Sequence, residues 1–347
     1  MSNISNLFSY LCLMIFLTGG TGLVGSHILL KLAQQGIVFK ALKRSSSSLE
    51  VCKNIFSHYK ASDLFSKINW VDGDINDIPS LEEGMQDCEL VLHCAAIVSF
   101  NSADAELMRK VNIEGTANVV NVALYNGVKK VGYISSIAAL GRNSTVGIVD
   151  EECHFKATKL DSNYALSKYY AEQEVWRASQ EGLDVVIVNP SVILGPGDWT
   201  KGSSQIFQRI YKGLKFYSTG STGYVDVVDV ANSLIALIFS DIKNERFIIN
   251  GANLKYRDCF DRIAEGLGKS KATIKVTPFL KEIAWRIETF RSFITGNKPL
   301  ITKETANSAM TDGSYSTAKI KSAINFQFTD INNTIKKYCD WFIEDLK

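Results

Sequence analysis

A tyrosine and a lysine four residues apart give the sequence its clearest sign of chemistry. Tyr164 and Lys168 belong to the segment Tyr-Ala-Leu-Ser-Lys, and helical spacing would place the phenol and the ammonium on one face. Two serines, Ser135 and Ser136, end an apolar run earlier in the chain. A phenol, an ammonium and a hydroxyl can together move a proton at an oxygen while a hydride moves at the neighbouring carbon.

The three groups have separate expected roles in such a transfer. A phenol with an ordinary pKa of about 10 is a poor base at neutral pH, and a nearby ammonium favours the phenolate. We therefore assign Lys168 to lower the pKa of Tyr164 and to hydrogen-bond the ribose of a nicotinamide cofactor. The serine hydroxyl would hold the substrate oxygen against Tyr164.

A glycine-rich loop near the start of the chain predicts a dinucleotide site. Its glycines are spaced G-x-x-G-x-x-G between an apolar run and an amphipathic stretch. This spacing allows a tight turn, a close approach of backbone to pyrophosphate, and close packing of helix on strand. The first helical turn would offer free N–H groups to phosphate. We expect cofactor contacts from Gly19, Thr21, Gly22, Leu23, Val24 and Gly25.

Two later positions bear on the choice of cofactor. An NAD site usually has an acidic residue at the end of the second strand, whereas this chain has Lys43 and Arg44 there. Positive charge favours the 2′-phosphate of NADP over NAD, with Arg44 as the contact, although solvated side chains at a strand end would give the same sequence. After the third strand we expect Asp74 and Ile75 near the adenine, with Asp74 accepting from its amino group or, alternatively, capping a helix.

Short apolar runs alternate with longer amphipathic stretches, which predicts an α/β fold with a doubly wound parallel sheet of the Rossmann type. After Pro190 the alternation ends, so we expect a dinucleotide-binding domain over 14–190. Residues 191–347 would form a smaller α+β substrate lobe, with some segments returning to the first domain. Residues 1–13 would be an N-terminal extension. The expected strands lie near 14–18, 37–42, 67–71, 89–93, 130–135 and 184–188, and the expected helices near 23–35, 77–85, 104–126, 162–181 and 278–294, the last as a packed helix.

Composition restricts the classes of partner. Of 347 residues, 46% are hydrophobic and 21% charged, and a net charge of +2 gives no reason to expect nucleic acid. The seven cysteines are odd in number and form no C-x-x-C pair, which argues against a disulfide framework and a zinc site and favours the cytoplasm. The apolar stretch 11–17 lacks the charged start of a secretory signal and is too short to span a bilayer. We expect a small-molecule substrate, no metal and no stable membrane insertion.

In combination, these motifs resemble the extended short-chain dehydrogenase/reductase superfamily, also called the NAD-dependent epimerase/dehydratase family, over nearly all of 14–345. The segment His-Cys-Ala-Ala at 93–96 is similar to the family's H-x-A-A, whose backbone lies along the cofactor, which implies contacts from Ala95 and Ala96. Asn112 matches the family asparagine that supports a water-linked proton path toward the lysine. The stretch 189–198 resembles a hallmark of the substrate lobe and adds Pro190 to the implied cofactor contacts.

The resemblance also bears on the serine and on the substrate lobe. The distance to Gly141 implies that Ser136 is the catalytic serine, with Ser135 as the alternative. Asn189 stands where many relatives have arginine before the proline. Relatives dimerise through the helices that carry Asn112 and Tyr164, so a homodimer is implied.

Within the superfamily the chain looks most like the dihydroflavonol-4-reductase and 3β-hydroxysteroid dehydrogenase branch. This implies an NAD(P)(H)-dependent oxidoreductase acting on CH–OH groups, by NADPH-dependent reduction of a ketone or aldehyde or by the reverse oxidation. Two alternatives stay open: an NAD-dependent nucleotide-sugar epimerase and a non-catalytic nucleotide-binding regulator. Residues 191–193 lack the asparagine common in sugar-nucleotide epimerases, and 137–138 lack the Asp-Glu pair of sugar dehydratases.

Overall fold

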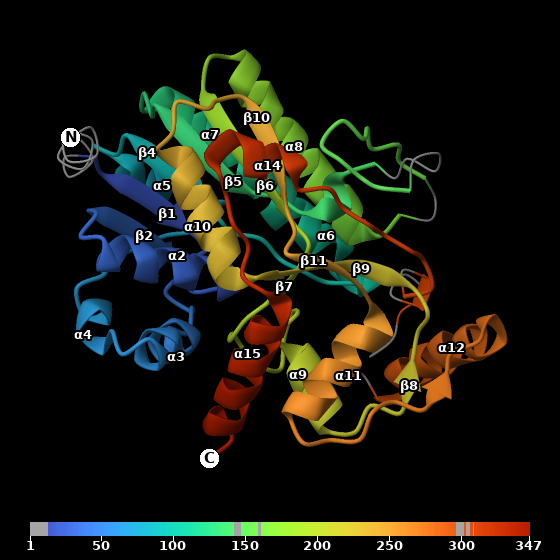
Figure 1. The fold of residues 1–347 in the computed structure, drawn as a ribbon. Helices are drawn as coiled ribbons and strands as arrows, with labels where there is room; N and C mark the ends of the chain where they lie inside the picture. The colour runs from blue at the N-terminus through green and yellow to red at the C-terminus, as the bar shows by residue number, and fades with distance from the viewer. Residues whose placement is uncertain (1–12, 142–146, 159–160, 296–301, 303–305, 308) are drawn as a thin grey trace.

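A seven-stranded parallel sheet forms the centre of the molecule (Figure 1). The computed structural model describes residues 13–141, 147–158, 161–295, 302, 306–307 and 309–347, so all but the last residue of the extension expected at 1–13 lies outside it. The strand order β10-β6-β5-β4-β1-β2-β3 reverses direction between β1 and β4, which is where ligands bind in open α/β sheets. The strands are β1 (Ile15–Thr18), β2 (Phe39–Lys43), β3 (Asn69–Asp72), β4 (Leu90–His93), β5 (Lys130–Ile134), β6 (Asp184–Pro190) and β10 (Glu245–Ile249).

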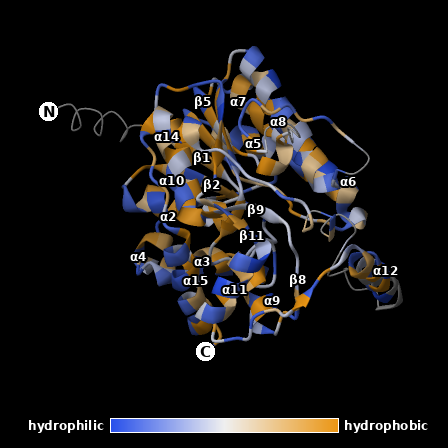
Figure 2. Ribbon diagram, turned by 45° about the vertical axis from the view of Figure 1, so that its right-hand side comes forward, coloured by the Kyte–Doolittle hydropathy of each residue, from blue (hydrophilic) through white to orange (hydrophobic). Residues whose placement is uncertain are grey.

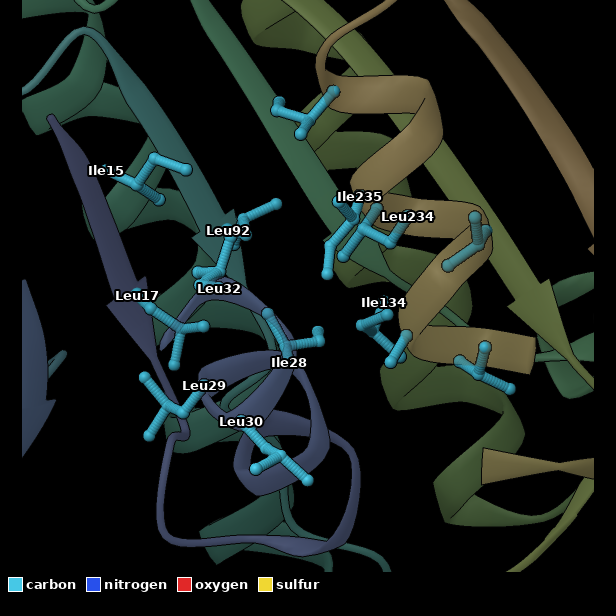
Figure 3. Close-up of a cluster of buried hydrophobic side chains, with 14 of the residues drawn as sticks. Ile15, Leu17, Ile28, Leu29, Leu30, Leu32, Leu92, Ile134, Leu234 and Ile235 are labelled. Atoms are coloured by element: carbon cyan, nitrogen blue, oxygen red, sulfur yellow. The ribbon is translucent and has the colours of Figure 1, made fainter. Parts of the chain in front are cut away.

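Helices cover both faces of the sheet, and its central strands are buried along their whole length and mainly apolar. One face packs on α2 (Leu23–Gln34), α3 (Glu50–His58) and α10 (Val227–Ile238), and the opposite face on α5 (Ile78–Met85), α7 (Gly115–Tyr125) and α8 (Asn163–Gln180). Figure 3 shows the first of these layers, in which Leu17, Ile28 and Leu234 come from strand and helices. Hydrophobic residues gather along the central strands in Figure 2, while the covering helices are mixed in colour. The predicted Rossmann sheet is confirmed.

The predicted elements are present with three differences. The helix expected over 104–126 is divided into η1 (Ser102–Asp104), α6 (Ala105–Met108), a π-helical stretch η2 (Arg109–Glu114) and α7. The crossover between β2 and β3 contains α3 and the short α4 (Ser62–Phe65), which the sequence pattern did not indicate. A seventh strand, β10, joins the sheet beside β6 from far along the chain.

Apart from α10 and β10, most of the chain after Pro190 forms a second, smaller group of elements below the sheet in Figure 1. A mixed three-stranded sheet contains β7 (Val192–Leu194), β9 (Ser221–Asp226) and β11 (Ala252–Lys255), and β8 (Phe216–Tyr217) pairs with β12 (Ile274–Lys275). The helices of this lobe are α9 (Gln205–Tyr211), α11 (Tyr256–Gly266), α12 (Pro278–Thr295) and α15 (Ile331–Asp345), while α14 (Ala318–Ile324) returns to pack beside β10. This arrangement agrees with the expected α+β lobe. The division at residue 190 stays a prediction.

The helix expected at 278–294 is present as α12, which lies at the outer edge of the lobe in both views (Figures 1 and 2). Its side chains Phe279 and Ile287 are exposed by 76% and 62%, so the expected packing does not extend to this side of the helix. Within the described part of the chain, no helix combines the length and the apolar character needed to cross a bilayer.

A buried aspartate ties the two parts of the molecule together. Asp226 begins α10 and accepts hydrogen bonds from the backbone N–H of Val228 at 2.8 Å, from Thr334 Oγ1 at 2.8 Å and from the Tyr338 hydroxyl at 2.7 Å. Thr334 and Tyr338 belong to α15, so one carboxylate links the last helix to a helix that covers the main sheet. Buried carboxylates require such partners, because an unpaired one is costly.

Tyr338→Phe should therefore lower the free energy of unfolding by about 2 kcal/mol, since it removes one hydrogen bond to a buried charge. Guanidinium unfolding measures the change. Tyr125→Phe is the matched control, because Tyr125 is 81% exposed and should show no effect. Equal stabilities for the two variants would contradict this role for Asp226.

Candidate active site

The glycine loop follows β1 and opens α2, as expected. Gly19 has a φ of +75°, and a Cβ there would lie 2.5 Å from the backbone nitrogen of Ala95. A Cβ on Gly25 would lie 2.1 Å from the Gly19 carbonyl oxygen. Gly22 differs, because its Cβ would meet only that same oxygen at 3.4 Å. The fold itself thus requires glycine at 19 and 25, whereas at Gly22 the chain leaves open space beside the helix end.

The N-terminus of α2 is open to an anion. Gly22 is its N-cap and provides no side-chain cap, so the N–H groups of the first turn have no such partner. Leu23 packs against the glycines of the loop at 195–197, so Leu23 and its half-buried neighbour Val24 offer backbone rather than side chain to a ligand. Thr21 is half-buried beside them. A pyrophosphate fits this arrangement of exposed glycine and free N–H groups.

A cavity of about 450 Å³ adjoins the ends of β2 and β3 and is lined by Arg44, Ser45, Ser46, Asp72, Gly73, Asp74, Asp77 and Ser80. Lys43 pairs with Asp72, whereas the exposed Arg44 side chain has no ion-pair partner among the described residues. Of the two cations considered at this strand end, Arg44 is the one available to a phosphate.

The two residues expected near the adenine differ in placement. Asp74 Oδ1 accepts from the backbone N–H and the side-chain amide of Asn76 at 2.8 and 3.0 Å, which forms a local turn, while Asp77 is the N-cap of α5. The helix-cap alternative for Asp74 is therefore wrong. The side chain of Ile75 is buried against Gly115, and its carbonyl accepts from Asn118 at 3.0 Å.

The structure brings Ser136 and Tyr164 together at the carboxyl edge of the sheet. Ser136 follows β5 and caps the short helix η3 (Ile137–Ala139), and Tyr164 lies in the first turn of α8. Burial raises the pKa of Tyr164, and a hydrogen bond with the Ser136 side chain offsets part of that rise. The phenol therefore stays protonated at neutral pH, so it is prepared to give a proton rather than to take one.

Lys168 lies one helical turn after Tyr164 on α8 and is 2% exposed. Its Nζ donates to the Tyr133 hydroxyl at 2.9 Å and to the Ile134 carbonyl at 2.7 Å. Burial lowers the pKa of Lys168 to about 7, and the charge of Glu172 acts in the opposite direction. The expected lowering of the Tyr164 pKa by Lys168 is not found, because the ammonium is bonded to the end of β5 and burial dominates at the phenol.

Asn112 lies in the π-helical stretch η2 and links a loop to the catalytic helix. Its Oδ1 accepts from the Ile97 N–H at 2.7 Å, and its Nδ2 donates to the Ile97 carbonyl and to Ser167 Oγ, both at 2.9 Å. Ser167 in turn donates to the Tyr164 carbonyl at 2.8 Å. Single π-helical turns recur at functional sites, and this one directs Asn112 toward α8.

The loop that Asn112 holds carries Ala95 and Ala96 and then an apolar side chain that sequence reasoning missed as a site residue. The Phe100 ring meets the Tyr164 ring edge-on at 5.6 Å and is 40% exposed. By contrast, Phe207 and Tyr224 of the second lobe are buried in its core. The apolar segment at 95–100 indicated an aromatic residue close to the site. The direction of its side chains, however, depends on the hydrogen bonds between Asn112 and Ile97.

The two serines at the end of β5 have different partners. Ser135 Oγ donates to the buried Glu172 carboxylate at 2.6 Å, whereas Ser136 meets Tyr164. This division supports the assignment of Ser136. Pro190 ends β6, beside Ile249 of β10, at the same edge of the sheet.

The surroundings of His93 and Cys94 indicate that both residues have a structural role. The two His93 ring nitrogens lie 2.7 Å from Thr18 Oγ1 and 2.9 Å from Thr116 Oγ1, and burial lowers the pKa of His93 to about 3. Burial raises the pKa of Cys94 to about 12. Both are neutral groups at physiological pH, and both His93 nitrogens already have partners.

Residues 15–249, which include the glycine loop, Ser136 and Tyr164, match one family model, described as the NAD dependent epimerase/dehydratase family. The chain belongs to this family. The resemblance stated from the sequence is confirmed.

Relatives include reductases and dehydrogenases. The chain is 36% identical over 218 residues to a putative dihydroflavonol 4-reductase of Synechocystis, covering 62% of this chain and 60% of that protein. It is 24% identical over 306 residues to a decarboxylating sterol-4-alpha-carboxylate 3-dehydrogenase of Dictyostelium discoideum, covering 83% of this chain and 88% of the other. The fold is shared with a UDP-glucose 4-epimerase from Thermotoga maritima, with a TM-score of 0.75 at 20% identity over 96% of this chain and 100% of that one.

Alanine at Gly22 and at Gly25 should separate ligand binding from folding. Gly22 has a φ of −93°, which any residue adopts, so Gly22→Ala should leave unfolding nearly unchanged while weakening NADPH binding about tenfold or more. Gly25→Ala should lower the free energy of unfolding by about 2 kcal/mol, because its Cβ meets backbone. Fluorescence titration and guanidinium unfolding measure both effects. Unchanged NADPH affinity in Gly22→Ala would contradict the phosphate site.

Proposed function

We propose that this protein reduces a ketone or aldehyde with NADPH, or catalyses the reverse oxidation. The observation that carries the proposal is the half-buried Tyr164 phenol, protonated at neutral pH and hydrogen-bonded with Ser136 at the carboxyl edge of the sheet. A carbonyl reduced by hydride transfer needs one proton at its oxygen, and a phenol whose pKa is raised by burial can supply it at neutral pH.

The residues divide the reaction between them. Ser136 donates a hydrogen bond to the carbonyl oxygen and holds it against Tyr164. NADPH, when bound, supplies the hydride that adds to the carbonyl carbon. Tyr164 passes its proton to the oxygen, so C=O becomes CH–OH. Lys168, Asn112 and water return a proton to the phenolate, for which a lysine with a pKa of about 7 is suited.

We infer NADP rather than NAD from the end of β2. Lys43 is neutralised by Asp72, but Arg44 lines the cavity as an exposed cation suited to a 2′-phosphate. Contacts to the rest of the cofactor would come from the glycine loop and the segment at 95–96.

The substrate side favours a carbonyl compound with apolar surface. Phe100 and Val98 are exposed by 40% and 53% on the loop beside the phenol. The named relatives include enzymes of dihydroflavonol and sterol chemistry, which agrees with such a surface.

Tyr164→Phe tests the proposal directly. The variant keeps the ring packing on Phe100 but removes the proton donor, so kcat for NADPH oxidation with a carbonyl panel should fall about 10²- to 10⁴-fold while NADPH affinity stays within about threefold. Tyr170→Phe on the same helix is the matched control, because Tyr170 is 47% exposed. Tightly retained NAD without net turnover would favour the epimerase instead, and failure to bind either cofactor would contradict both enzymes.

Arg44→Ala tests the choice of cofactor. Loss of one charge-assisted contact should raise the Kd for NADPH about tenfold and leave that for NADH unchanged. Lys40→Ala removes the same charge from the preceding strand β2, where Lys40 donates to the Gln86 carbonyl at 2.8 Å, and should change neither Kd. An equal loss of affinity for NADPH and NADH in Arg44→Ala would contradict a 2′-phosphate contact.

A further inference from the structure

A buried carboxylate lies one helical turn beyond Lys168. The Glu172 side chain is 1% exposed and accepts four hydrogen bonds. Its Oε2 accepts from Ser135 Oγ at 2.6 Å and from Asn189 Nδ2 at 2.8 Å. Its Oε1 accepts from Trp176 Nε1 at 3.3 Å and from Arg246 Nη1 at 3.1 Å. Burying a charged group with its counter-ion usually stabilises less than apolar packing would, so its presence beside the site calls for a role.

The partners of Glu172 reach the catalytic serine. Asn189 on β6 donates from the same Nδ2 to the Ser136 carbonyl at 3.0 Å. Ser135, bonded to the carboxylate itself, directly precedes Ser136 in the chain. Glu172 therefore fixes the end of β5 from two sides. A displacement of that strand end would move Ser136 relative to Tyr164.

Arg246 holds the carboxylate from the edge strand β10. Its guanidinium also donates to the Glu151 carbonyl, at 2.9 Å from Nε and 2.5 Å from Nη2, and to the Cys153 carbonyl at 3.3 Å. With these bonds the guanidinium is fixed by backbone as well as by Glu172. It is the cation paired with this carboxylate in the described part of the chain.

Glu172 is also the charged neighbour of Lys168. The other titratable groups around the ammonium are neutral at physiological pH: His93 and Cys94 from the end of β4, Tyr133 from β5 and Tyr164 from α8. Burial keeps the pKa of His93 at about 3 and that of Cys94 at about 12. The charge of Glu172 raises the pKa of Lys168 against the effect of burial. Arg246 limits that influence, because it neutralises the carboxylate from its far side.

We propose that Glu172 is a positioning residue of the catalytic centre, held by Arg246 and Asn189 so that its carboxylate fixes the strand end that carries Ser136 and supplies the counter-charge to Lys168. The proposal rests on the Ser136–Tyr164–Lys168 chemistry inferred above. It also gives Asn189 and Arg246, from two neighbouring strands, a common task at one carboxylate.

Two substitutions should shift the pKa of Lys168 in opposite directions. Glu172→Gln keeps the shape and the accepting oxygen for Ser135 and Asn189 but removes the charge, so the pKa of Lys168 should fall by about one unit. Arg246→Gln leaves the carboxylate without its cation, so the pKa of Lys168 should rise. The Lys168 Cε chemical shift in ¹³C-lysine-labelled protein, assigned with Lys168→Arg, reports this pKa without substrate or cofactor.

In turnover, the alkaline limb of the pH profile of kcat/KM for carbonyl reduction should follow the same shifts. It should move to lower pH in Glu172→Gln and to higher pH in Arg246→Gln, because Lys168 must be protonated to return a proton to the phenolate. Ser135→Ala is the matched control, since it removes one hydrogen bond to Glu172 and leaves every charge in place. The Lys168 pKa should not change in that variant.

Shifts of opposite sign support the proposal, because general loosening of the site would not produce them. Shifts of the same sign, or none, in variants that unfold at the wild-type temperature would overturn it. If Glu172→Gln does not fold, an unchanged Lys168 pKa in Arg246→Gln overturns it equally. The NMR shifts without any carbonyl turnover by the wild type would support this arrangement while contradicting the proposed function.

Discussion

Lys168 carries its ammonium into the junction between β5 and α8, and the rest of the site follows from what that buried charge needs. Water is replaced there by the Tyr133 hydroxyl and the Ile134 carbonyl, so the lysine can occupy this place only where the strand ends and its last carbonyl is free. The same strand end carries Ser136, and the same helix carries Tyr164. Satisfying the ammonium thus places the three groups at one edge of the sheet.

Hydrogen bonds and ring packing from the surrounding elements hold the groups at this edge in place. Asn112, turned toward α8 by the π-helical stretch, holds the loop that brings Phe100 onto the phenol. The resulting burial keeps Tyr164 protonated, which suits proton donation to a reduced carbonyl more than removal of a proton from an alcohol at neutral pH. On the cofactor side of the site, packing requires glycine at 19 and 25, while Gly22 leaves the helix end open.

Much of this could be predicted from sequence. Hydrophobic periodicity placed six strands and the catalytic helix, because the central strands are buried on both faces. Periodicity could not show β10, since a strand that joins the sheet from residue 245 is specified by tertiary packing. The Y-x-x-x-K spacing located Tyr164 and Lys168 on one helix but not the bonds of the ammonium, which go to Tyr133 and Ile134. Asn189, taken from the sequence as a departure from relatives, proved to be a partner of Glu172 once β5, β6 and α8 were in place.

In the proposed reaction, hydride passes from NADPH to a carbonyl carbon while Tyr164 gives the proton. The most direct measurement supplies NADPH carrying deuterium at the transferred position of C4, with an apolar ketone or aldehyde, and determines the mass of the alcohol product by mass spectrometry. We predict one deuterium on the carbinol carbon and a matching loss of NADPH, with both greatly reduced in Tyr164→Phe. Label that stays in the cofactor, with no alcohol formed from any carbonyl tested, would contradict it.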